Sequence, residues 1–126
     1  MRSPGPHKMP ANTRNMHATP QNLAPERVAE LLAAGEVDLV DVREPYERAA
    51  GYIEGSRHVQ LGELTEAAVD RARPVVFVCR VGGRSAFATQ AFRRAGYDAY
   101  NLDGGMVEWV GRGLPLAPDA GYVADH

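Results

Sequence analysis

Apolar residues occur along this chain in two kinds of segment. In residues 25–35 they repeat at helical spacing, with Val28 and Leu31 between a proline at the start and a glycine at the end, which predicts a helix. The segment VVFVC (75–79) is instead a short continuous apolar run, and VDLVDV (37–42) is a short segment rich in valine; both are typical of buried strands. Helical and strand patterns therefore coexist in one short chain.

The remaining segments continue this alternation of strands and helices. Further short strands are expected at 57–59 and 97–102. Further helices are expected at 44–50 (a turn or short helix), at 61–70, and at 84–96 with Ala88, Ala91, Phe92 and Ala95 on its apolar face. A last helix is expected around Met106, Val107 and Trp109, whose side chains we expect to pack on the sheet. Strands separated by helices predict an α/β fold with a mainly parallel central sheet and helices on both faces.

The regular pattern extends over residues 23–118, and both ends of the chain lack it. Residues 1–22 are rich in proline and contain no acidic residue, so we expect a disordered N-terminal tail. Residues 119–126 are expected to form a shorter C-terminal tail. A chain of 126 residues suits a single domain.

Composition and charge narrow the classes of function. A net charge of -2 argues against a general nucleic-acid binder, and the apolar runs are too short to cross a membrane. The single cysteine cannot form an internal disulfide, and no secretory signal pattern is present, so we expect a reducing, cytoplasmic location. The four histidines are scattered without metal-ligand spacing, and we expect neither a metal nor an organic cofactor.

The single cysteine, Cys79, ends the strongest predicted strand. Ligand sites in open α/β sheets gather at the carboxyl ends of the strands. Gly82 and Gly83 permit a sharp turn in which backbone amides point inward, and Arg80 and Arg84 add positive charge. The amides at the start of the next helix add to this field, which favours the reactive thiolate form of a cysteine.

A lone cysteine at the end of an apolar strand is more often a small core residue than a reactive group. Burial of a thiol, however, needs neither the two glycines nor the two arginines of this loop. The residues alone therefore favour a reactive thiolate that handles anions.

The motif CRVGGRS resembles the active loop of the rhodanese family of sulfurtransferases. Three more segments resemble motifs of that family in the same order and spacing: DLVDVREPYE at 38–47, GYIEGSRHVQL at 51–61 and NLDGGMVEWVGRGLP at 101–115. The first of them contains an Asp-x-Arg motif formed by Asp41 and Arg43, which we expect to be a structural ion pair. The resemblance covers about residues 23–118 and implies a single rhodanese-like domain.

This resemblance also implies a two-step sulfur transfer. Cys79 would take a sulfur atom from thiosulfate or a similar anionic donor as a persulfide, and pass it to cyanide, a thiol, or a thioredoxin-like or other sulfur-accepting protein. The donor would be bound by the rest of the loop: Arg80, Val81, Gly82, Gly83, Arg84 and Ser85. Two roles of Arg84 are equally compatible with the sequence: it contacts the donor, or it braces the loop.

Two alternatives stay open. One is a non-catalytic rhodanese module that docks a partner protein, although such modules often lack the cysteine. The other is a phosphatase of related fold, but those enzymes have five residues between cysteine and arginine, whereas Cys79 and Arg84 are separated by four. His58 is expected to pack or lie at the surface rather than act as a base.

Overall fold

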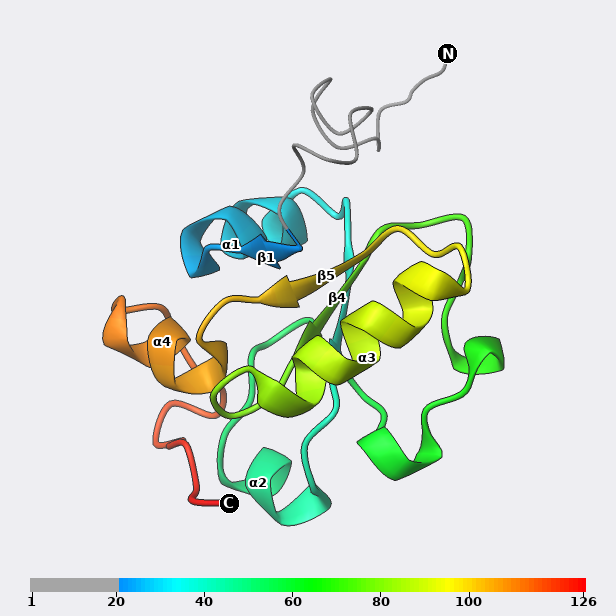
Figure 1. Cartoon of the computed structure of the whole chain (residues 1–126). Helices are drawn as coiled ribbons and strands as arrows, with labels where there is room; N and C mark the ends of the chain where they lie inside the picture. The colour runs from blue at the N-terminus through cyan, green and yellow to red at the C-terminus, as the bar shows by residue number, and fades with distance from the viewer. Residues whose placement is uncertain (1–20) are drawn as a thin grey trace.

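The computed structural model describes residues 21–126 and contains a five-stranded parallel sheet (Figure 1). The strand order is β1-β5-β4-β2-β3. The strands are β1 (Asn22–Leu23), β2 (Asp38–Asp41), β3 (Arg57–His58), β4 (Val75–Val78) and β5 (Ala99–Leu102). The predicted parallel α/β fold is confirmed.

Helices cover both faces of the sheet, as predicted. They are α1 (Pro25–Ala33), α2 (Pro45–Ala50), α3 (Gly83–Arg94) and α4 (Gly105–Gly111). Val76 and Val78 of β4 pack in one core cluster with residues of α1 and α4, whereas Val75 and Phe77 pack in a second cluster with residues of α3. Figure 1 shows α3 lying across β4 and β5. The alternate side chains of a central strand thus fill two separate cores.

The segment 61–70 is not the helix that we predicted. It forms two 3-10 turns, η2 (Leu61–Glu63) and η3 (Glu66–Ala68), separated by Leu64 and Thr65 in extended conformation. Its spaced apolar side chains, which suggested a helix, instead pack one by one against the core beside α3.

Two residues predicted to be buried are exposed. Val107 of α4 is 43% exposed, while Met106 and Trp109 are buried as predicted, because Val107 lies about 100° around the helix from Met106. Ala91 of α3 is also exposed. Part of the buried face of α3 is polar and consists of Ser85 and Thr89. The apolar pattern therefore located Ala88 and Phe92 correctly on the buried face of α3 but did not reveal its polar part.

The N-terminal end of the chain is only partly described. The strand β1 was not predicted, and it pairs with β5 through Asn22 and Leu23. Residues 1–20 of the predicted disordered tail lie outside the described part of the chain, whereas Asn22, which we also assigned to that tail, lies in β1. The domain boundaries stay a prediction. Within residues 21–126, no helix has the length and apolarity that crossing a bilayer requires.

Candidate active site around Cys79

Cys79 directly follows β4, which lies between β2 and β5 in the sheet. The chain then turns from strand to helix, and α3 begins at Gly83. Gly82 makes this turn possible because its φ of 108° lies in the left-handed region, which L side chains rarely adopt. The predicted strand, glycine turn and helix are confirmed, with the helix beginning one residue earlier than expected.

The sulfur atom of Cys79 lies under this turn and faces hydrogen-bond donors. The N–H groups of Gly82 and Ser85 point at Sγ over 3.1 and 3.4 Å, and the Ser85 hydroxyl lies 3.3 Å from it. The cysteine residue is only 1% exposed. Donors at the start of a helix stabilise negative charge, so this arrangement suits a thiolate or another anionic sulfur species.

A chain of polar contacts extends from the buried side chains of Ser85 and Asn101 to the exposed Asn22 in β1. The Ser85 hydroxyl lies 2.5 Å from Oδ1 of Asn101 in β5, and the Asn101 amide donates to Oδ1 of Asn22 over 2.8 Å. A hydroxyl has a single hydrogen, so Ser85 donates either to Asn101 or to the sulfur. Sequence reasoning missed Asn101, although an asparagine within the predicted strand 97–102 is an unusual feature that could have indicated it.

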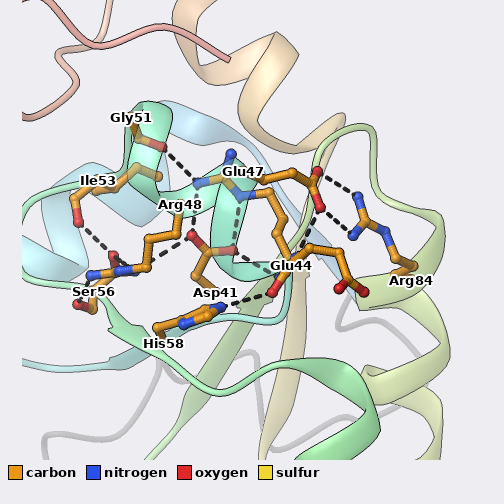
Figure 2. Close-up of polar contacts among 10 residues, drawn as sticks. Asp41, Glu44, Glu47, Arg48, Gly51, Ile53, Ser56, His58 and Arg84 are labelled. Atoms are coloured by element: carbon orange, nitrogen blue, oxygen red, sulfur yellow. Dashed lines mark hydrogen bonds and ion pairs between the residues drawn. The ribbon is translucent and has the colours of Figure 1, made fainter. Parts of the chain in front are cut away.

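Arg84 forms a bidentate ion pair with Glu47 of α2 (Figure 2). Its Nη1 and Nη2 atoms lie 2.8 and 2.9 Å from the two carboxylate oxygens of Glu47. Burial disfavours the charged form of Glu47, but hydrogen bonds from Arg84 and from the Glu44 N–H outweigh this and keep its pKa below the ordinary value. Of the two possible roles of Arg84, this geometry favours the brace.

The start of α4 supports the loop from the other side. The N–H groups of Met106 and Val107 donate to the carbonyl oxygens of Cys79 and Arg80 over 2.9 and 3.0 Å. A Cβ atom at Gly105 would lie 2.5 Å from both carbonyl oxygens. The backbone φ of Gly105 is 64°, in the left-handed region that favours glycine. A glycine at 105 therefore lets α4 approach the cysteine loop closely.

A hollow of about 260 Å³ opens at the cysteine. It is lined by Cys79, Arg80, Val81, Gly83, Arg84 and His126. A larger hollow of about 610 Å³ lies beside α1 and the segment 53–57. None of the residues that line the smaller hollow lines the larger one. Of the two hollows, only the smaller one has the thiol of Cys79 among its lining residues, so it is the candidate site. His126 was not predicted to be there.

The Asp41 and Arg43 pair is a structural ion pair, as predicted. Arg43 donates from Nε and Nη2 to the two carboxylate oxygens of Asp41 over 2.9 and 2.8 Å, and both side chains are buried. Nε2 of His58 lies 2.7 Å from the Arg43 carbonyl oxygen, so His58 packs in this cluster (Figure 2). The cluster fixes the segment that leads into α2, and α2 carries Glu47.

Residues 24–112 match the family described as the Rhodanese-like domain. The chain belongs to the rhodanese family. The chain is 40% identical over 97 residues to the thiosulfate sulfurtransferase GlpE of Pseudomonas aeruginosa, which covers 75% of this chain and 87% of that one. This finding confirms the family and enzyme class predicted from the sequence.

Two further relatives agree with this class and fold. The putative sulfurtransferase YtwF of Bacillus subtilis is 35% identical over 82 residues, covering 64% of this chain and 80% of that one. The crystal structure of a rhodanese-related protein from Thermoplasma volcanium superimposes with a TM-score of 0.70 at 28% identity, covering 76% of this chain and 96% of that one. The rhodanese fold predicted from the motifs is thus confirmed in three dimensions.

Proposed function

We propose that this rhodanese moves a sulfane sulfur from thiosulfate or a similar anionic donor to a thiophilic acceptor, through a persulfide on Cys79. The observation that carries the proposal is the placement of the sulfur, which faces two backbone N–H groups and a hydroxyl under the first turn of α3. The thiosulfate sulfurtransferase GlpE relatives support the reaction class.

In the first step, the Cys79 thiolate attacks the outer sulfur of thiosulfate. A bond forms between Sγ and that sulfur, and the sulfur–sulfur bond of the donor breaks, with its electron pair leaving on sulfite. The loop from Arg80 to Ser85 binds the donor, and Arg80 faces its sulfonate group. The Gly82 and Ser85 donors stabilise the anionic persulfide that results.

In the second step, a nucleophile attacks the terminal sulfur of the persulfide. The new bond forms on the acceptor, and the electron pair of the broken sulfur–sulfur bond returns to Cys79 as a thiolate. Cyanide leaves as thiocyanate, and a thiol leaves as a hydropersulfide. Because Cys79 is the only cysteine in the sequence, the chain cannot resolve the persulfide as an internal disulfide.

The acceptor in the cell is a small thiol or a sulfur-accepting protein, such as a thioredoxin-like protein. A cytoplasmic location fits this chemistry, since a reducing compartment keeps both thiols free. Neither a metal nor an organic cofactor takes part in the two steps. Loop residues supply the binding and the charge stabilisation that the reaction requires.

The test is turnover with thiosulfate and cyanide, measured as thiocyanate. Wild-type protein should form thiocyanate with ping-pong kinetics, and Cys79→Ser should reduce the rate to the uncatalysed level. Equal turnover by Cys79→Ser would overturn the proposal. Cys79-dependent hydrolysis of an aryl phosphate without sulfur transfer would favour a phosphatase instead.

A further inference from the structure

The C-terminal residues 119–126 pack against α2, on the active-site side of the molecule (Figure 1). The N–H of Tyr122 donates to the carbonyl oxygen of Ala50 over 2.9 Å. The hydroxyl of Tyr46 donates to the backbone oxygen of Asp125 over 3.1 Å. Backbone and side-chain contacts thus hold this segment in place.

Close backbone packing adds to these hydrogen bonds. Val123 packs against the core cluster that contains α1 and α4. A Cβ atom at Gly51 would lie 2.6 Å from the Tyr122 carbonyl oxygen, so the two backbones touch there. These contacts involve no residue of the cysteine loop. The segment therefore has its own anchors, independent of the cysteine loop that it reaches.

The anchored segment brings a negative charge to the cation at the hollow. Oδ1 of Asp125 lies 3.3 Å from Nη2 of Arg80, and His126 lines the hollow with Cys79. Among the described residues, Asp125 is the only carboxylate that pairs with Arg80. Arg84 is already engaged by Glu47. Arg80 is thus the cation available to an anionic donor, and Asp125 competes for it.

We propose that Asp125 is a specificity-determining residue that weakens the preference of the site for anionic sulfur donors by pairing with Arg80. This proposal rests on the proposed function where it concerns donors. The Asp125 side chain is 98% exposed and that of Arg80 is 32% exposed, so solvent screens the pair and a substrate can displace it. Asp125 therefore tunes the charge selectivity of the site without closing it.

The test compares the rate of alkylation of Cys79 by anionic iodoacetate with that by neutral iodoacetamide at low ionic strength. Mass spectrometry of the intact protein monitors both reactions. The rate constant for iodoacetate divided by that for iodoacetamide isolates the effect of probe charge from the reactivity of the thiol. In Asp125→Asn the ratio should rise about two- to fivefold, and high salt should remove the difference. An unchanged ratio would overturn the proposal.

Asp119→Asn is the matched control, because it removes the same charge from the same segment at an exposed position. Its ratio should equal that of wild type, and an equal rise in both variants would also overturn the proposal. In the transfer assay, Asp125→Asn should lower KM for thiosulfate with kcat unchanged. If wild type transfers no sulfur, the proposed function fails, and the alkylation ratio still decides the role of Asp125.

Discussion

The hydroxyl of Ser85 is shared between two acceptors that differ in charge. It lies 2.5 Å from the neutral Asn101 amide oxygen and 3.3 Å from the sulfur of Cys79. When the sulfur is anionic, as a thiolate or a persulfide, a hydrogen bond to it becomes stronger. Ser85 therefore contributes most when charge resides on the sulfur.

Replacing Ser85 should consequently reduce catalysis more than stability. We expect Ser85→Ala to lower kcat/KM for thiosulfate about three- to tenfold, since a net hydrogen bond is worth about 0.5–1.5 kcal/mol. The measurement is steady-state formation of thiocyanate. Thr89→Val is the control, because it removes a buried hydroxyl from α3 that bonds the Ser85 carbonyl oxygen and not the sulfur. Equal loss in the two variants would contradict a specific role of Ser85.

Single residues differed in how well the sequence predicted them. Cys79, Gly82 and Ser85 are neighbours in the chain, so their local motif was sufficient to predict that they meet. Glu47 and Asn101 reach the same site from α2 and β5, and nothing in a local pattern pairs them with Arg84 and Ser85. Predicting such pairs requires the fold.

At the scale of elements, the site is a strand and a helix joined by a turn and supported by a second helix. The strand β4 presents Cys79, and the first turn of α3 covers its sulfur. The helix α4 then binds the carbonyl oxygens of Cys79 and Arg80. The cysteine loop is therefore set from two directions, and the contact with α4 depends on a glycine.

Adding one methyl group at that contact should disrupt the site. Gly105→Ala would place Cβ 2.5 Å from two carbonyl oxygens at a φ of 64°, so we expect a loss of more than about 2 kcal/mol in the free energy of unfolding and a loss of turnover. Urea unfolding and the thiocyanate assay measure the two effects.

Gly111→Ala in the same helix is the control. Nothing lies within 4 Å of the added Cβ there, so its stability should stay within about 1 kcal/mol of wild type, toward stabilisation. Similar stability of Gly105→Ala and Gly111→Ala would contradict the close approach of α4 to the loop.

Most elements were predictable because their patterns are local. Proline and glycine bound the first helix, a continuous apolar run marked β4, and a short valine-rich segment marked β2. The segment 61–70 was mispredicted because apolar spacing alone does not separate a helix from two 3-10 turns with an extended link. The strand β1 has two residues, too short to produce a pattern, and it exists through its pairing with β5.

At the scale of the whole molecule, distant segments meet at the carboxyl end of the parallel sheet. The brace comes from α2, the loop support from α4 and an acidic side chain from the C-terminal segment. The motifs of the family predicted the fold and the place of Cys79 at the end of β4, but they did not predict the carboxylate beside Arg80. That charge depends on a segment beyond the motifs.

The central claim is that Cys79 carries the transferred sulfur. Mass spectrometry of the intact protein tests it directly, because a persulfide adds the mass of one sulfur atom. After incubation with thiosulfate, wild-type protein should gain the mass of one sulfur atom and release one equivalent of sulfite. Cyanide should then restore the original mass and yield one equivalent of thiocyanate, while Cys79→Ser gains nothing. Thiocyanate formation without any mass gain in wild type, or the same gain in Cys79→Ser, would contradict the account.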